Sequence, residues 1–442
     1  MSIINTFDNN NGRCQIEDSK DFYHLKKIGS QPIEDLCYNN GSSLLIFPQS
    51  FAENGDNVGK GMLFSINEDA KTIYTNNIMG FVGYKGTCLA IHSRFTSDKN
   101  DYFLHYMLQK VFKFNLFDLN FPTDEEQIFY FLPFMFPYFL KKAMRQGLYK
   151  EYQTRRYNDS NVRGSIDVER YINTDVPFMG NIAYNTREFA FDNHLTELIR
   201  HTIEYIATKP YGAGVLSTDE ETSEDIRIIK QATPRYIKRD RFKILSENIR
   251  PVTHPYFYEY RDLQRICVMI LHEEEVKYGE DDEEIHGILF DGAWLWEEYL
   301  NTILQKLNFI HARNKTGENP IYIFEKPKAA IRYPDFYKYD DFVLDAKYKG
   351  YGGVDVSAVG REDLHQIITY MWILNVHKGG FVFPLKANQE CKPTRTLSGI
   401  NGEIGMYGLN VSNIVKQGYS KFCEQMNIEE TKLLKILMAQ QK

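Results

Sequence analysis

The sequence has little of what marks secreted, zinc-binding and membrane proteins. Its six cysteines are scattered without a CxxC pair, at Cys14, Cys37, Cys88, Cys267, Cys391 and Cys423. No basic segment followed by an apolar one stands near the N-terminus. These absences argue against a disulfide scaffold, a zinc ribbon and a secretory signal, and they favour a reducing, cytoplasmic compartment.

Long apolar runs are also missing. The most apolar window is Ile128 to Leu140, thirteen residues interrupted by Pro133 and Pro137. A membrane-spanning helix needs roughly 20 apolar residues. We therefore expect a buried or interface segment here and no membrane association.

Several catalytic signatures are absent as well. The sequence has no GxxxxGK[ST] phosphate loop, no HExxH and no GxSxG, so nucleotide hydrolysis, zinc proteolysis and α/β-hydrolase chemistry lack support. The net charge of −7 argues against nonspecific coating of nucleic acid. A local basic run, which includes Arg239 and Arg241 beside Tyr236 and Phe242, is equally consistent with a DNA backbone contact and with an ordinary solvated surface.

The 442 residues are enough for two or three domains, and the pattern predicts a multidomain α+β protein. Short β-type runs between Gly and Asn clusters indicate a β-rich module over residues 1–120. Residues 121–285 read as a mainly helical connecting region, with Phe189 to Ala207 as one candidate helix. We expect an α/β domain over 286–390 and a C-terminal extension over 391–442 that the pattern does not place.

The α/β domain carries the informative pattern. A helix at Trp294–Leu307 precedes three β-type runs, and a helix and a strand follow them. The three runs are Ile321–Phe324, Ile331–Tyr337 and Phe342–Tyr348; the later elements are Asp363–Val376 and Phe381–Leu385. This order predicts a small mixed sheet flanked by helices.

Three polar residues on this frame suggest chemistry. Strand alternation places Asp345 and Lys347 on one face, with Ala346 on the other, and a hairpin would bring Asp335 to that same face. Converging carboxylates need a cation, and oxygen ligands suit Mg²⁺ or Mn²⁺, with the Ala346 carbonyl as a third ligand. The metal would polarise a phosphodiester while Lys347 orients water or stabilises charge.

A bare D…DxK string is common, and paired Asp and Lys often form a surface ion pair instead. Asp345, however, ends the apolar run Phe342-Val343-Leu344, where a merely structural charge would be costly. The arrangement is typical of a PD-(D/E)xK restriction-endonuclease-like domain.

Neighbouring elements offer supporting residues. Glu297, or the adjacent Glu298, lies on the preceding helix and could reach the metal directly or through water, although a solvent-exposed helix face is equally consistent. Gln366 and Tyr370 are four residues apart and share a helix face, from which they could support the active face or touch DNA.

At these residues the chain resembles the McrC family, the nuclease subunit of McrBC-type modification-dependent restriction systems. The specific strings are YPDFYKYDDFVLDAKYK, from Tyr333 to Lys349, and REDLHQIITYM, from Arg361 to Met371. Weaker likeness appears in WLWEEYL at 294–300, NVRGSID at 161–167 and IHSRF at 91–95.

The resemblance implies a nuclease that works with an McrB-like AAA+ GTPase hexamer on double-stranded, modified DNA. It also implies that the N-terminal module engages and stimulates that ring. If the roles of the family's motif residues are carried over to this sequence, Asp335 and Asp345 would bind metal, Lys347 would be catalytic, and Glu297 and Gln366 would support them. A double-strand break needs two active sites or two successive cuts, so we also expect nuclease domains to pair as a homodimer.

Two alternatives stay open. The chain could be a non-catalytic activating subunit of the AAA+ motor, with the nuclease-like domain as a scaffold. It could also be a stand-alone nuclease of the RecB kind or of the CRISPR-associated kind, although the dispersed cysteines lack the spacing for an iron–sulfur cluster.

Overall fold

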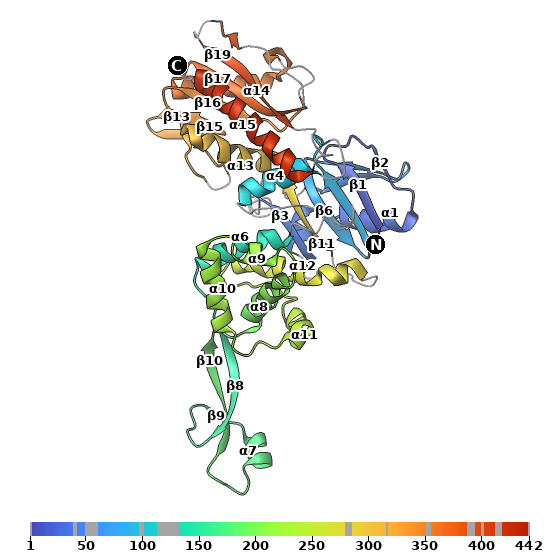
Figure 1. Cartoon of the computed structure of the whole chain (residues 1–442), viewed down its shortest axis with the longest axis vertical. Coiled ribbons are helices and arrows are strands. Elements are labelled where there is room, and N and C mark those ends of the chain that lie inside the picture. Colours follow the sequence, from blue (N-terminus) through green and yellow to red (C-terminus); the bar gives the residue numbers. More distant parts are fainter. Residues whose placement is uncertain are drawn as a thin grey trace. The chain divides into compact units, whose positions relative to one another are not determined.

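The computed structural model describes residues 2–38, 42–48, 61–96, 101–112, 132–278, 285–314, 317–350, 355–386, 394–398, 402–411 and 418–440. The chain forms two compact units: one joins Met1–Phe131 to Glu275–Lys442, and the other is Leu132–Glu274. Helices and several sheets make it a mixed α+β protein, as the sequence predicts (Figure 1). The predicted boundaries after residues 120, 285 and 390 stay predictions. None of the helices in the described ranges is long and apolar enough to cross a membrane.

The first sheet of the discontinuous unit is built around a buried hairpin. β6 (Ile78–Tyr84) pairs antiparallel with β7 (Thr87–His92), and every residue of β6 is buried. β1 (Ser2–Phe7) runs parallel to β7. On the other side, β11 (Ile285–Asp291) pairs antiparallel with β6 and parallel with β3 (Ser42–Phe47). A strand from beyond the second unit therefore sits inside the N-terminal sheet.

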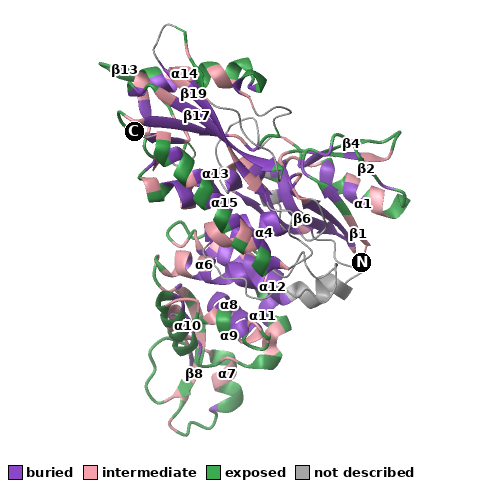
Figure 2. Ribbon diagram, turned by 45° about the horizontal axis from the view of Figure 1, so that its top comes forward, coloured by how far each residue is buried: buried purple, intermediate pink, exposed green. Residues whose placement is uncertain are grey.

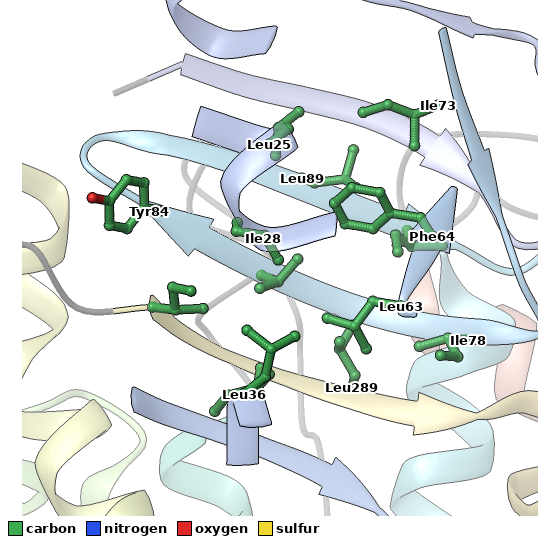
Figure 3. Packing of buried hydrophobic residues seen from close by; sticks show 14 of the residues in the cluster. Leu25, Ile28, Leu36, Leu63, Phe64, Ile73, Ile78, Tyr84, Leu89 and Leu289 are labelled. Carbon is green, nitrogen blue, oxygen red and sulfur yellow. The ribbon is translucent and has the colours of Figure 1, made fainter. Parts of the chain in front are cut away.

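One face of this sheet is covered by two helices and a small antiparallel sheet. The helices are α1 (Ser19–Gly29) and α2 (Ile33–Tyr38), and the strand order is β2 (Cys14–Gln15), β5 (Thr72–Thr75), β4 (Phe64–Asn67). Figure 3 shows the apolar side chains that meet there: Leu25, Ile28, Leu36, Leu63, Phe64, Ile73, Ile78, Leu89 and Leu289. Burying these side chains is the main force that holds the module together.

The second sheet of the same unit has six strands. In order they are β12 (Ile310–His311), β15 (Phe336–Lys338), β16 (Phe342–Ala346), β17 (Lys378–Lys386), β19 (Glu403–Val411) and β18 (Arg395–Thr396). β15 and β16 form an antiparallel hairpin, whereas β16, β17 and β19 run parallel. β17 and β19 are buried along most of their length (Figure 2). β19 comes from the tail that the sequence pattern leaves unplaced.

The predicted strand Ile331–Tyr337 is wrong as a single element. β14 (Lys328–Arg332) instead pairs with β13 (Ile321–Glu325) in a separate hairpin, and β15 begins only at Phe336. Pro334 lies in the gap between the two strands, and proline has no N–H to donate to a strand ladder. The break lets the backbone turn at Asp335.

Helices pack around the second sheet. α14 (Arg361–Leu374) starts with two acidic residues in its first turn, which suits the helix dipole, and ends at left-handed Asn375. It lies close to β17 because Gly379 leaves room: a Cβ there would meet the Met371 sulfur at 2.7 Å. The remaining helices are α4 (Tyr102–Phe112), α13 (Gly292–Leu304), the short η2 (Gln305–Leu307), η3 (Val356–Ala358) and α15 (Tyr419–Gln440).

A buried carboxylate joins three of these helices. Glu430 of α15 accepts hydrogen bonds from Tyr106 of α4 at 2.7 Å and from Tyr299 of α13 at 2.9 Å. Lys110 pairs with the same carboxylate at 3.2 Å. The helix from the unplaced tail therefore belongs to the packed core of this unit.

The second unit is helical with a long β-hairpin. Its helices are α6 (Leu132–Met144), α8 (His194–Ala207), α9 (Gly212–Leu216), α10 (Glu220–Ala232), η1 (Lys238–Asp240), α11 (Arg241–Glu247) and α12 (Tyr260–Tyr278). The hairpin pairs β8 (Glu151–Asp159) with β10 (Ile182–Ala190), and β9 (Ser165–Ile166) and α7 (Val168–Thr174) lie at its far end (Figure 1).

The predicted helix Phe189–Ala207 starts too early. Phe189 and Ala190 end β10, and the helix begins at His194 after Asn193, whose side chain caps it in a reciprocal capping box with Thr196. The apolar spacing continues through both elements, but the Asn193 cap fixes the true start.

Candidate active site

The β15–β16 hairpin brings the two predicted metal-binding aspartates together. Phe336 pairs with Leu344, so Asp335 stands opposite Asp345 at the end of the hairpin. The Asp335 carboxylate accepts a hydrogen bond from the Ala346 backbone N–H at 2.6 Å. The backbone of Asp335 is also held, because its carbonyl accepts from Ala312 N at 3.3 Å and contacts His311 Nδ1 at 2.8 Å.

Asp345 and Lys347 lie on the same face, as strand alternation predicts. Lys347 Nζ is 2.8 Å from Asp345 Oδ2, and Asp345 is only 1% exposed. The Lys347 ammonium therefore pairs with a carboxylate that is almost fully buried. Desolvating a carboxylate and an ammonium costs free energy that their attraction does not always repay.

Burial and mutual repulsion disfavour negative charges on Glu297, Asp335 and Asp345 at the same time. Desolvation, together with the charges of Glu297 and Asp345, raises the pKa of Asp335 well above its usual range. Burial likewise raises the pKa of Asp345, although Lys347 opposes that shift. Burial also works against the Lys347 ammonium, but the carboxylate of Asp345 outweighs it and raises the pKa of Lys347. These are the conditions under which a cation is favoured.

The two glutamates on α13 have different surroundings. Glu298 holds Arg313 through two hydrogen bonds of 2.9 and 3.0 Å, and it lies 3.4 Å from His311 Nε2. Since the other nitrogen of His311 faces the Asp335 carbonyl, Glu298 supports the backbone of the site. Glu297 acts on the Asp335 carboxyl through its charge, which is consistent with the preference for Glu297 over Glu298 as the group facing the site.

The predicted Gln366–Tyr370 pair is in place on α14. Gln366 Nε2 donates to the Tyr370 hydroxyl at 2.9 Å, and that hydroxyl donates to the Tyr333 carbonyl at 3.4 Å. Tyr333 is two residues before Asp335, so the pair supports the turn that presents this carboxylate. Gln366 is exposed.

Sequence reasoning missed two contributors. Asp363, on the first turn of α14, lies 3.2 Å from Lys347 Nζ and 3.1 Å from Lys349 Nζ. Its place three residues before Gln366 on one helix was the available signal, since such spacing puts both on the same face. Arg94, in the weakly matching string IHSRF, donates to the Tyr348 carbonyl at 2.9 Å. Nothing in a single sequence links Arg94 to Tyr348.

The arginines proposed as DNA contacts belong to the other unit. Arg241 stacks over the ring of Tyr205 and donates to the Leu271 carbonyl, so it has a structural role there. Arg239 is 86% exposed and lies 3.9 Å from Asp240. A DNA contact by either residue stays a prediction.

The donor set fits a hard divalent cation. Within the described ranges, no group of three or more His, Cys, Asp or Glu side chains is arranged as a self-sufficient metal cage. Mg²⁺ does not need one, because it usually keeps several waters and binds one or two carboxylates plus substrate phosphates. The carboxylates of Asp335 and Asp345, with the Ala346 carbonyl, could supply such a partial shell. The site therefore combines oxygen ligands, a buried lysine and a supporting helix, which is a set suited to phosphodiester hydrolysis.

Comparisons with known proteins give one family match and likenesses to solved structures. A family model described as McrBC 5-methylcytosine restriction system component matches residues 73–384. No curated protein matches the sequence. One solved chain comes from a refined half-complex of a tetradecameric assembly of Thermococcus gammatolerans McrB AAA+ hexamers with bound McrC. It is 16% identical, with a TM-score of 0.49, and covers 96% of this chain and 99% of its own. Another, from the McrBC complex of the same organism, is 15% identical, with a TM-score of 0.33, over 69% of this chain and 88% of its own.

Proposed function

Because the chain belongs to the family of McrBC 5-methylcytosine restriction system components, we propose that it is the DNA endonuclease subunit of such a system. Its reaction would be Mg²⁺-dependent hydrolysis of DNA phosphodiesters, with Mn²⁺ as the alternative metal. Its nuclease domain would be the PD-(D/E)xK sheet that carries β15, β16 and α14. In this proposal an McrB-like AAA+ GTPase hexamer delivers double-stranded, modified DNA.

The observation that carries the proposal is the meeting of Asp335, Asp345 and Lys347. Asp335 contacts the Ala346 N–H at 2.6 Å, and Lys347 contacts Asp345 at 2.8 Å. Two desolvated carboxylates and a lysine at one strand end are expensive to maintain for stability alone. A catalytic role accounts for that cost.

Each residue then has a definite task. Asp335, Asp345 and the Ala346 carbonyl would hold the cation. When bound, Mg²⁺ polarises the phosphodiester and lowers the pKa of a coordinated water. Lys347 would orient the attacking water and stabilise the negative charge that develops on the phosphoryl oxygens. The oxygen of water would bond to phosphorus and lose a proton to solvent, the bond from phosphorus to the deoxyribose oxygen would break, and that leaving oxygen would take up a proton from solvent.

A surface in the second unit supports docking on a partner protein. The far end of the β8–β10 hairpin exposes an unusual number of apolar side chains: Ile166, Val168, Ile172, Val176, Phe178 and Met179. No residue of α7 is buried, and Met179 is 86% exposed. Clustered exposed apolar groups mark interaction sites. We propose that this end binds the AAA+ ring, in place of or in addition to the N-terminal module over residues 1–120.

The proposal is tested by cutting modified and unmodified plasmids with the chain, its AAA+ partner, GTP and Mg²⁺. Lys347→Ala should lower cleavage by about 100-fold or more while leaving the stimulation of GTP hydrolysis intact. Lys338→Ala is the matched control, because Lys338 lies on the same hairpin but pairs with Asp341 at 3.0 Å. The control should cut at the wild-type rate.

The competing function is an activating subunit without catalysis. It would gain support if the wild type stimulated GTP hydrolysis but cut none of a panel of modified DNAs. A stand-alone nuclease would instead cut without partner or GTP. Pairing of two nuclease domains on DNA, which a double-strand break favours, is tested by the mass of the DNA-bound assembly.

A further inference from the structure

Lys347 stands between two carboxylates that belong to different elements. Its ammonium is 2.8 Å from Asp345 Oδ2 on the strand side and 3.2 Å from Asp363 Oδ1 on the first turn of α14. The Lys347 side chain is 15% exposed, and the two aspartates are 2% and 17% exposed. Little water is available there to replace either carboxylate as a partner of the ammonium.

The pairing with Asp345 conflicts with the proposed chemistry. Asp345 Oδ2 is a buried carboxylate oxygen whose charge is already paired with the Lys347 ammonium, so a divalent cation that binds it must compete with that ammonium. A divalent cation and an ammonium on the same oxygen repel each other strongly where the dielectric constant is low. Metal binding therefore requires Lys347 to give up its contact with Asp345.

Asp363 offers the ammonium a second position within the site. Its other oxygen, Oδ2, accepts a hydrogen bond from Lys349 Nζ at 3.1 Å, which fixes the carboxylate beside Lys347. The N-terminal turn of a helix also favours a negative charge at this place. Lys347 could thus shift from one carboxylate to the other with a small movement and remain beside the reacting phosphate.

We propose that Asp363 is a positioning residue that takes the Lys347 ammonium when a divalent cation occupies Asp345. This inference rests on the proposed function, because it assumes that Asp345 binds metal. Asp363 lowers the electrostatic cost of loading the metal, and it keeps the lysine aimed at the site after loading. Without Asp363 the ammonium keeps its contact with Asp345, and there it competes with the cation.

The test is a double-mutant cycle on metal affinity, measured without DNA. Isothermal titration of the full chain with MgCl₂ and with MnCl₂ compares wild type, Asp363→Asn, Lys347→Ala and the double variant. Asp363→Asn should weaken metal binding roughly fivefold to tenfold when Lys347 is present. In the Lys347→Ala background the same change should alter the affinity by less than about twofold.

Matched variants distinguish the proposed role of Asp363 from a general effect of removing negative charge and from a loss of folding. Glu362→Gln removes one negative charge from the same helix turn, where Glu362 is exposed, and should leave the affinity near wild type. Asp363→Glu keeps a carboxylate and should restore most of the binding. Thermal unfolding of every variant confirms that the chain is folded.

The outcomes are distinguishable. An equal loss of affinity in both lysine backgrounds, or no loss in either, overturns the role of Asp363 while leaving the nuclease proposal intact. Absence of metal binding by the wild type, or binding that survives Asp345→Asn, overturns the proposed site and this inference with it. Only the loss that depends on Lys347 supports the exchange between carboxylates.

Discussion

Arg94 donates a hydrogen bond to the backbone carbonyl of Tyr348, the residue that follows Lys347 of the candidate site, at 2.9 Å. The same guanidinium lies 3.1 Å from the buried carboxylate of Asp8 and stacks over the Tyr348 ring. The Tyr348 hydroxyl contacts Ser93 Oγ at 2.7 Å. The N-terminal sheet therefore fixes the chain immediately after Lys347.

Replacing Arg94 by Ala should destabilise the protein and lower cleavage together. Its loss leaves the buried Asp8 carboxyl group without its cation, so that group must stay charged and unpaired or take up a proton, which costs up to about 3 kcal/mol in free energy of unfolding. Arg94→Lys should not rescue, because one ammonium cannot bridge Asp8 and the Tyr348 carbonyl as a planar fork does. Chemical denaturation measures the loss; Arg13→Ala, an exposed change in the same module, should stay within about 0.5 kcal/mol.

Because of Asp8, the free energy of unfolding should fall as the pH rises. Burial raises the pKa of Asp8 from 3.8 to about 7, despite Arg94. Between these values the folded protein holds more protons than the unfolded chain, so stability falls as pH rises from about 4 to 7. In Asp8→Asn this contribution disappears, so unfolding curves at pH 5 and pH 8 should differ less than in the wild type. An equal change of stability between pH 5 and pH 8 in the wild type and in Asp8→Asn would contradict the prediction.

Metal should stabilise the wild type but not Asp335→Asn. Mg²⁺ that binds only the folded state raises stability, by about 2.7 kcal/mol at 100 times its dissociation constant. Asp335→Asn removes one proposed ligand but keeps an oxygen for the Ala346 N–H, and it relieves repulsion from Glu297 and Asp345. In EDTA the variant should be at least as stable as the wild type. A thermal shift with Mg²⁺ that persists in the variant would argue against this ligand assignment.

The adjacent glutamates of α13 should respond differently to the same change. Glu298→Gln weakens the paired hydrogen bonds to Arg313 and should cost about 1 to 2 kcal/mol in stability. Glu297→Gln should leave stability nearly unchanged and lower cleavage about tenfold, since its charge acts on Asp335. Each variant is the control of the other, and reversed phenotypes would show that the assignment is wrong.

Polar replacement at the end of the hairpin should uncouple the chain from its partner. Phe178→Ser with Met179→Ser removes two exposed apolar side chains and should leave the melting temperature unchanged. Stimulation of the partner's GTP hydrolysis should fall at least tenfold. Tyr23→Ser, which removes a 67% exposed aromatic from the N-terminal module, tests whether that module docks instead.

Local patterns in the sequence were enough to place the central part of the candidate site. Alternation put Asp345 and Lys347 on one face, a hairpin brought Asp335 opposite, and helical spacing paired Gln366 with Tyr370. These relationships span at most a few residues or a single turn. They need no knowledge of distant contacts.

Long-range contacts account for what the sequence did not reveal. β11 joins β3 and β6 across more than 190 residues, and Arg94 reaches Tyr348 across 254. The sequence favoured Glu297 over Glu298, but it did not reveal that Arg313 and His311 lie beside Glu298. The break at Pro334 was visible in the sequence, but the apolar spacing around it concealed the end of one strand and the start of another.

The position of β11 has a consequence during synthesis of the protein. β3 ends at Phe47, and β11, its strand partner among the described residues, starts at Ile285, 238 residues later. At 5 to 20 residues per second, a ribosome takes roughly 12 to 48 s to make that stretch. During this interval the apolar strand Leu44–Phe47 has no partner, and the nascent chain is open to aggregation or to capture by a chaperone. The N-terminal sheet can therefore be completed only after the ribosome has synthesised the whole second unit.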